Sequence, residues 1–302
     1  MKKKLVVLNL ISIVFMALLQ SFSQEIENNP LVKKGAKLNK ISSQFKFTEG
    51  PAVDKKGNVF FTDQPNNTIW KYDTKGNLSL FLENSGRSNG LFFDKKGILY
   101  ACADENNQLW AIDEKGNHTV LLENYEGKLL NGPNDLWIDA SGGIYFTDPF
   151  YPREYWKRKN QEIEEKRLYY LPKNAKVAKI LDADFKQPNG IVGSGDGKYL
   201  YVADIGASKT YRYEITGTGQ IANRQLFAEM GSDGMTTDSE GNLYLTGKGV
   251  TIFDKAGKKI GHIPVPAGWT ANVTFGGKKR NLLFITALES VYTLEMNVKG
   301  VN

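Results

Sequence analysis

The sequence predicts an all-β fold, a six-bladed β-propeller built from four-stranded antiparallel blades. A repeated strand pattern, the spacing of its copies and the chemistry of the turns all predict it. The pattern is a turn followed by an alternating apolar strand, and its six copies begin at Gly57, Gly97, Gly142, Gly197, Gly241 and Arg280. Successive copies start 40, 45, 55, 44 and 39 residues apart. Such a period, with several short strands in each repeat, is typical of propeller blades.

The segment ahead of the repeats has the features of a secretory signal peptide. Three lysines at positions 2–4 are followed by an apolar run over residues 5–19 and by small residues near 21–23, in the order of such a signal. We therefore assign residues 1–23 to a signal peptide and residues 24–302 to a single domain, secreted or periplasmic. An uncleaved anchor is the alternative. No later apolar run approaches the length that crosses a bilayer, so no membrane association is expected after cleavage.

The charge of the mature chain is small. The 302 residues carry 39 Lys+Arg and 33 Asp+Glu, a net charge of +6, and loss of three lysines with the signal peptide reduces it to +3. This balance gives no reason to expect a nucleic-acid partner. Cys102 is the only cysteine, which excludes an internal disulfide bond and a cysteine-rich metal site. We expect a monomer that acts on a small molecule.

Each repeat continues with a second β-type run, so four strands per blade account for the spacing. These runs lie at residues 69–73, 109–113, 168–171, 211–215, 250–254 and 291–294. The sixth repeat ends after its third strand, near Glu295, whereas residues 38–47 alternate as a strand before the first repeat. We infer that this N-terminal strand is the outer strand of the last blade. It would close the ring and protect an otherwise unpaired edge.

The turns between strands repeat an Asp-x-x-Gly sequence. Asp accepts hydrogen bonds from its own turn and Gly adopts a positive φ there, so we interpret these carboxylates as structural rather than catalytic. The residues concerned are Asp54, Asp73, Asp94, Asp113, Asp139, Asp238 and Asp254.

A second set of equivalent positions in the repeats indicates a functional site. The residue eight positions before each repeat start carries a side-chain oxygen: Glu49, Asn89, Asn134, Asn189, Asp233 and Asn272. Each lies where an innermost strand begins, and equivalent positions of a closed propeller face one axis. One or two such residues could cap local backbone, but six in one register indicate a shared site.

The ligand types predict a hard cation at this ring. Two carboxylates and up to four amide oxygens, without Cys or His, suit Ca²⁺ first and Mg²⁺ or Mn²⁺ next, with Zn²⁺ also possible. Without a cation, Glu49 and Asp233 would repel each other and one would tend to bind a proton. We expect Asn89, Asn134, Asp148, Tyr151 and Asn272 to contact the substrate.

One connection is much longer than the others. It follows Asp148 and spans about residues 150–167, with Tyr151, Arg153, Tyr155 and Trp156 available to stack on or hydrogen-bond a polar ring. Strand order brings it to the end of the channel that holds the ring. It is either a lid over the mouth or only a charged, solvated loop.

The sequence resembles the SMP-30/gluconolactonase/LRE family of six-bladed propellers over residues 45–296. The matching stretches are Phe47-Thr-Glu-Gly-Pro51, Asn131-Gly-Pro-Asn-Asp-Leu136, Tyr145-Phe-Thr-Asp-Pro149, Gln187-Pro-Asn-Gly190, Tyr201-Val-Ala-Asp204, Ser232-Asp-Gly-Met235, Thr274-Phe-Gly-Gly277 and Phe284-Ile-Thr286. The resemblance implies metal ligands at Glu49, Asn189 and Asp233, and a ligand or substrate contact at Asn134. Animal members carry an Arg where this chain has Gly132, so their sugar contacts do not transfer.

The resemblance favours lactone hydrolysis. The cation would polarise the ring carbonyl, and Asp233 would act as general base for the attacking water, or would only orient a metal-bound hydroxide. A phosphotriesterase on the same metal, or a non-catalytic sugar- or protein-binding propeller, are the alternatives. A Ser-His-Asp triad is not expected, because His118 and His262 fall near outer strands, and Cys102 is interpreted as a buried apolar residue.

Overall fold

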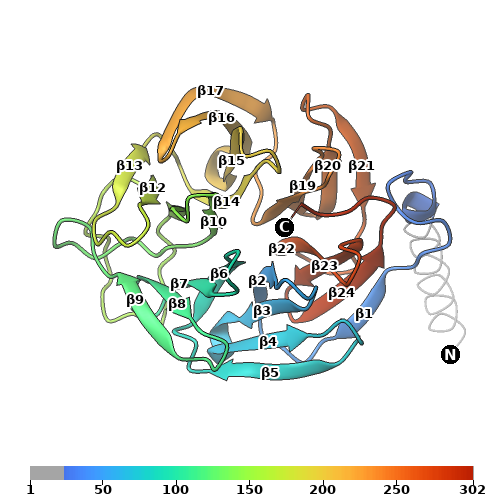
Figure 1. Ribbon diagram of the computed structural model, residues 1–302, viewed down its shortest axis with the longest axis horizontal. Helices are drawn as coiled ribbons and strands as arrows, with labels where there is room; N and C mark the ends of the chain where they lie inside the picture. The colour runs from blue at the N-terminus through green and yellow to red at the C-terminus, as the bar shows by residue number, and fades with distance from the viewer. Residues whose placement is uncertain (1–23, 302) are drawn as a thin grey trace, which may run out of the picture.

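The structure is a computed structural model that describes residues 24–301, and it confirms the six-bladed β-propeller (Figure 1). Six four-stranded antiparallel sheets stand around one axis, and in five of them the chain runs from the innermost strand outward through all four strands. The first three blades consist of β2 (Thr48–Val53), β3 (Val59–Asp63), β4 (Thr68–Tyr72) and β5 (Leu78–Glu83); β6 (Ser88–Phe93), β7 (Leu99–Ala103), β8 (Gln108–Ile112) and β9 (His118–Leu122); and β10 (Leu136–Ile138), β11 (Ile144–Asp148), β12 (Arg167–Leu171) and β13 (Lys179–Asp182).

The remaining blades repeat this order. They consist of β14 (Pro188–Gly193), β15 (Tyr199–Asp204), β16 (Lys209–Gly217) and β17 (Gln220–Ala228); β18 (Met235–Thr237), β19 (Leu243–Gly247), β20 (Gly249–Phe253) and β21 (Lys259–Ile263); and β22 (Asn272–Gly276), β23 (Leu282–Ala287), β24 (Ser290–Glu295) and β1 (Asn39–Ser42). Two 3₁₀ turns, η1 (Gln64–Asn66) and η2 (Ile205–Ala207), follow β3 and β15.

The N-terminal strand closes the ring as expected, although it is shorter than the 38–47 run. β1 pairs antiparallel with β24, with Asn39 opposite Thr293. After it, the buried Phe45 packs edge-on against Phe61 and Trp70 of the first blade, with ring centroids 5.2 and 5.4 Å apart. The first and last blades are therefore joined both by strand pairing and by an aromatic cluster.

The apolar core lies between facing blades. Alternate residues of each strand point to opposite faces of its sheet, and both faces are covered by neighbouring blades, so most inner strands are buried along their whole length. The largest fully buried side chains are aromatic and include Tyr145, Tyr169, Tyr244 and Phe284. Such wide side chains fill the space that opens between blades with distance from the axis.

The Asp-x-x-Gly turns have the structural role that the sequence predicts. In each, one oxygen of the Asp carboxylate accepts the backbone N–H groups two and four residues later; for Asp54 these are Lys56 at 2.8 Å and Asn58 at 2.9 Å. Gly57 then has φ +92°, a left-handed conformation that other residues adopt only at a cost. The carboxylates of these turns therefore stabilise the turns and are not catalytic candidates.

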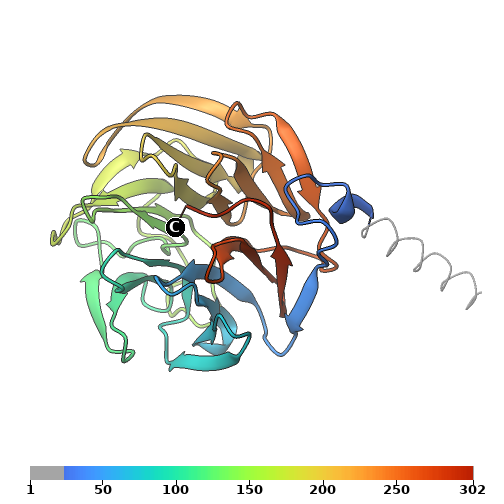
Figure 2. The ribbon, with the colours of Figure 1, turned by 45° about the vertical axis from the view of Figure 1, so that its right-hand side comes forward.

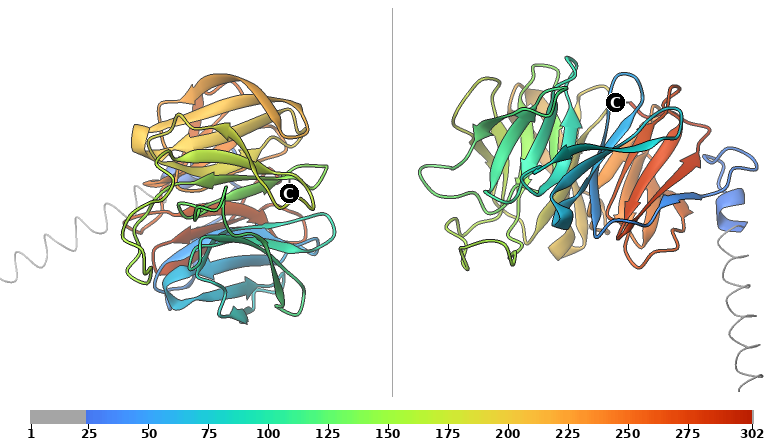
Figure 3. Two further views of the ribbon diagram at one scale, coloured as in Figure 1. Left: turned by 90° about the vertical axis from the view of Figure 1, so that its left-hand side faces the viewer. Right: turned by 90° about the horizontal axis from the view of Figure 1, so that it is seen from below.

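The two ends of the channel carry different features. Val301 lines the end that holds the Asp-x-x-Gly turns, whereas the loop that follows β11 extends from the opposite end (Figure 3). The N-terminal helical turn lies outside the ring, beside the last blades (Figure 2). Within residues 24–301, no helix is long and apolar enough to span a membrane. The predicted signal peptide, residues 1–23, lies outside the described residues.

Candidate active site

The six residues of the predicted ring all lie where innermost strands begin. Glu49, Asn89 and Asn189 are the second residues of β2, β6 and β14, Asn272 is the first of β22, and Asn134 and Asp233 precede β10 and β18 by two positions. The six innermost strands contact one another in sequence around the axis. Five of the six side chains are buried, and Asp233 is partly exposed. The ring therefore forms one layer at one end of the channel.

The strands are irregular at this layer. The β2–β3 pairing shifts between Glu49 and Ala52, and the same shift follows Ser88 in β6 and Pro188 in β14. Threonines near the C-terminal ends of β3 and β11 bind the shifted backbone of the next blade. Thr62 donates to the Asn89 carbonyl at 3.1 Å, and Thr147 donates to the Asn189 carbonyl at 2.7 Å. Bulged backbone anchored in this way fixes the direction of a side chain more closely than a regular ladder does.

Glu49 and Asp233 have the raised pKa values expected of carboxylates gathered in a buried site. Burial, and next the charge of Asp233, raise the pKa of Glu49 well above its usual value. Burial raises the pKa of Asp233 to about 6, opposed mainly by a hydrogen bond from Trp269. The amide of Asn272 lowers the pKa of Glu49, which places these side chains near one another.

Asn189 fits a cation ligand. Its Nδ2 donates to the Tyr151 hydroxyl at 3.0 Å, whereas its buried Oδ1 has no hydrogen-bond partner within residues 24–301. An unpaired buried acceptor costs free energy, which a hard cation would offset. No group of three His, Cys, Asp or Glu side chains in the described part of the chain could hold a metal alone, so the ring depends on its amide oxygens. With that donor set, the residues present fit Ca²⁺ or a similar ion.

Asp135 was missed by the sequence reasoning. It follows Asn134, and the equivalent position holds Gly50, Gly90, Gly190 and Gly234 in four other blades. A Cβ at Gly90 would lie 2.5 Å from Asp135 Oδ1, so the glycine clears room for this carboxylate beneath the ring. Burial raises the pKa of Asp135 to about 7. The single acid among glycines at this register was the signal that could have identified it.

Trp269 was also missed. It lies in the connection before β22, and its indole Nε1 donates to Asp233 Oδ2 at 2.6 Å. The bond fixes one oxygen of the carboxylate that we expect to act as base. Because connections of this kind have no fixed register, the repeat pattern could not place it.

The long loop, residues 149–166, contains no helix and contacts residues of the second, third and fourth blades. Trp156 is buried, and its Nε1 donates to the Asp104 carbonyl at 2.7 Å. A Cβ at Gly132 would lie 3.0 Å from the Trp156 ring and 2.9 Å from Asp104 Oδ1. The loop therefore occupies the space that a side chain at position 132 would need. Whether it also opens and closes as a lid stays a prediction.

Asp148 does not reach the mouth. It is fully buried, and its two oxygens accept the backbone N–H groups of Asn131 at 2.9 Å and Gly132 at 2.8 Å. Asp63 and Asp204 bind the equivalent backbone of their own blades. In this structure Asp148 therefore fixes the segment that leads to Asn134, and its expected contact with the substrate stays a prediction.

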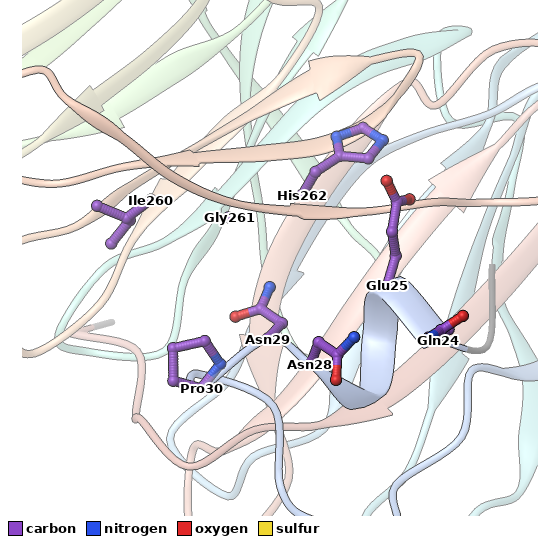
Figure 4. A pocket seen from close by; sticks show the side chains of 8 residues that line it. All are labelled: Gln24, Glu25, Asn28, Asn29, Pro30, Ile260, Gly261 and His262. Carbon is purple, nitrogen blue, oxygen red and sulfur yellow. The ribbon is translucent and has the colours of Figure 1, made fainter. Parts of the chain in front are cut away.

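The histidines and the cysteine lie away from the ring. His118 is in β9 and His262 in β21, both outermost strands. His262 lines a pocket of about 430 Å³ beside the N-terminal helical turn, where Glu25 lies near it (Figure 4). Cys102 is fully buried in β7. None of the three is placed for nucleophilic or base chemistry on a ligand at the ring.

A larger cavity, of about 730 Å³, occupies the other end of the channel. It is lined by Trp137 and Phe92 and rimmed by exposed lysines such as Lys95. Its carboxylates, Asp94, Asp139 and Asp196, lie in turns and accept the backbone N–H groups of those turns. It therefore lacks the converging oxygen ligands of the ring.

Comparison with known proteins identifies the family. A model of the SMP-30/Gluconolactonase/LRE-like region matches residues 47–289. The chain belongs to this SMP-30/gluconolactonase/LRE-like family. A gluconolactonase of Zymomonas mobilis is 27% identical over 86% of this chain and 81% of its own length. The structure of a gluconolactonase from Xanthomonas campestris superposes with a TM-score of 0.82 at 27% identity, covering 89% of this chain and 95% of that one.

A second relative, which matches a smaller part of the chain, carries a different name. The diisopropyl-fluorophosphatase of Loligo vulgaris is 25% identical over 55% of this chain and 57% of its own length. Family membership alone therefore leaves the substrate class open.

Proposed function

We propose that the protein is a divalent-cation-dependent hydrolase of sugar lactones. The observation that carries the proposal is the ring itself, two carboxylates and four amides at one end of the channel, with the unpaired Asn189 Oδ1 among them. Two gluconolactonase relatives that each align with more than four fifths of the chain support the lactone as substrate.

Glu49, Asn134, Asn189 and Asp233 would hold the cation. When bound, it would polarise the lactone carbonyl and stabilise the negative charge that develops on the carbonyl oxygen. The Tyr151 hydroxyl accepts the Asn189 Nδ2–H, which leaves Oδ1 available to the cation. Glu49 has a ligand role only. Ca²⁺ is the preferred ion because every ligand is an oxygen atom.

Asp233 is the proposed general base. Trp269 occupies Oδ2, and we assign Oδ1 as the atom that takes the proton from the attacking water. With a pKa of about 6 before a cation binds, Asp233 is mostly ionised at neutral pH, as a base must be. Coordination would lower this pKa and weaken the base, so the pH–rate profile of Asp233→Asn, measured with metal content confirmed, tests the assignment.

Hydrolysis of aldonolactones, followed by proton release, tests the function. The protein is first treated with a chelator and then supplied with Ca²⁺, Mg²⁺, Mn²⁺ or Zn²⁺ in turn. Turnover should require a cation and fall at least 100-fold in Glu49→Gln and in Asp233→Asn, since each removes a charged ligand. Asp254→Asn, in an outer turn, is the matched control and should retain full activity. Cation-independent turnover would contradict the proposal.

A phosphotriesterase is the second candidate, favoured by the Loligo vulgaris relative. The same cation could polarise a phosphoryl oxygen in place of a carbonyl. Diisopropyl fluorophosphate in the same substrate panel separates the two candidates. Export from the cytoplasm is likewise proposed, and a mature N-terminus at Gln24 would support it.

A further inference from the structure

The loop after β11 presents an arginine at the mouth of the ring. Tyr151, which binds the ring residue Asn189, lies directly beneath Arg153, whose guanidinium carbon is 5.6 Å from the centroid of the tyrosine ring. The charge of Arg153 is also close enough to lower the pKa of Asp233. The guanidinium therefore lies within reach of a ligand held at the ring.

Asp104, the carboxylate that binds Arg153, has different hydrogen-bond partners from its counterparts in other blades. In the first, third and fourth blades, the Asp at the end of the second strand binds two backbone N–H groups of its own blade. The second-blade counterpart, Asp104, instead accepts Arg153 Nε at 2.8 Å and the Tyr155 hydroxyl at 2.5 Å. Asp104 is buried and therefore holds the loop arginine in a fixed position.

Only one edge of the guanidinium is used. The ion pair to Asp104 engages Nε, and among residues 24–301 no hydrogen bond joins either terminal amino group to the protein. The Arg153 side chain is 25% exposed, so these groups are open to solvent. Two parallel N–H donors match the two oxygens of a carboxylate, and Arg rather than Lys provides this geometry.

We propose that Arg153 is a specificity-determining residue that binds an anionic substituent, a carboxylate, on the sugar lactone. This inference rests on the proposed function and adds a substrate class to it: lactones of sugar diacids are preferred to neutral aldonolactones. The carboxylate lies at the mouth on Arg153 while the lactone carbonyl lies at the ring.

A matched pair of substrates tests the proposal. D-glucaro-1,4-lactone and D-glucono-1,4-lactone differ only in a terminal carboxylate or hydroxymethyl group. The cation-loaded protein should prefer the first, and Arg153→Gln should lower kcat/KM for it roughly 10- to 150-fold, the range of a hydrogen bond to a charged group. Activity on the neutral lactone should fall less, so that the ratio of the two kcat/KM values drops about 10-fold or more, and Arg153→Lys should give an intermediate ratio.

Arg158→Gln is the control within the same loop. Arg158 stacks on Trp156 and donates to the Asn131 carbonyl, so its loss should lower Tm without changing the ratio of the two kcat/KM values. That ratio does not depend on the folded fraction, which keeps the test valid for a weakened variant. Equal losses on both lactones in Arg153→Gln would overturn the inference and leave lactone hydrolysis standing.

Binding separates failure of this inference from failure of the proposed function. If neither lactone is hydrolysed, calorimetric titration with D-glucuronate and with D-glucose examines the same contact without catalysis. Binding of glucuronate that is lost in Arg153→Gln would uphold the anion contact on a protein that is not a lactonase. Absence of glucuronate binding, or binding that Arg153→Gln leaves intact, would overturn it.

Discussion

Asp233 has the three properties that a general base at this site requires: partial exposure, a fixed orientation and a pKa near neutrality. The orientation comes from Trp269, whose indole N–H donates to Oδ2 at 2.6 Å. The same bond lowers the pKa of Asp233 against the larger effect of burial. If Asp233 is the base, Trp269 would act through it as a positioning residue.

Replacing Trp269 with Phe should lower kcat about tenfold, the effect of one lost hydrogen bond to a charged group. Because the donor lowers the pKa of Asp233, its loss should also move the acid limb of the kcat/KM profile to higher pH. Trp70→Phe is the matched control, since Trp70 bonds Thr68 in an outer strand. A Trp269 variant with lower kcat and an unmoved acid limb would show a structural role only.

The ionisation of Asp135, beside the ring, should make the stability of the fold depend on pH. Burial raises its pKa in the folded state to about 7, against 3.8 as its ordinary value. The folded state thus binds the proton more tightly, so the contribution of this group to stability is complete below pH 4 and is lost as pH rises through 7. In cation-free protein at pH 8 the buried charge costs about 4 kcal/mol.

Asp135→Asn should therefore raise the Tm of cation-free protein at pH 8, while the gain disappears near pH 4. Asn retains an oxygen for the Leu136 N–H, which Asp135 Oδ1 accepts at 2.9 Å. The same change should weaken Ca²⁺ binding about tenfold, because it removes a negative charge beneath the ring. Thermal unfolding at both pH values, with and without Ca²⁺, checks this. A lower Tm at pH 8 would show that the charge is not the dominant cost.

The loop after β11 and the strand β1 are the two elements that interrupt the regular propeller. The loop replaces a tight turn and is held at Asp104 rather than by strand pairing. Its charged, helix-prone sequence gave no indication of the side chains that anchor it, because those contacts join residues about 50 positions apart. β1 contributes only four residues but joins the two ends of the chain.

Removal of residues 24–43 should lower Tm by roughly 10 °C. The truncation leaves β24 without its outer partner and loosens Phe45, whose burial is comparable to that of core aromatics that contribute about 3–5 kcal/mol. The free edge should also promote self-association, visible by light scattering. Removal of the exposed residues 24–25 alone is the control and should leave β1 and Tm close to those of the intact chain. Equal Tm values for both truncations would contradict the assigned role of β1.

The closed ring explains how much of the molecule could be predicted from its sequence. Blade number, strand order, closure and the register of the six ring residues all follow from repetition, because equivalent positions of a ring face one axis. Residues that break the repeat were the ones missed. Asp135 replaces a glycine, and Trp269 comes from a connection without fixed register.

Cation binding by the ring is the central claim, and stoichiometric titration tests it most directly. Chelator-treated protein would be titrated with Ca²⁺ at pH 8 while turnover of an aldonolactone and heat of binding are followed in the same sample. We predict that both reach a plateau at one equivalent in the wild-type protein and that Glu49→Gln and Asp233→Asn abolish both. Full turnover before any cation is added, or unchanged binding in both variants, would contradict the account.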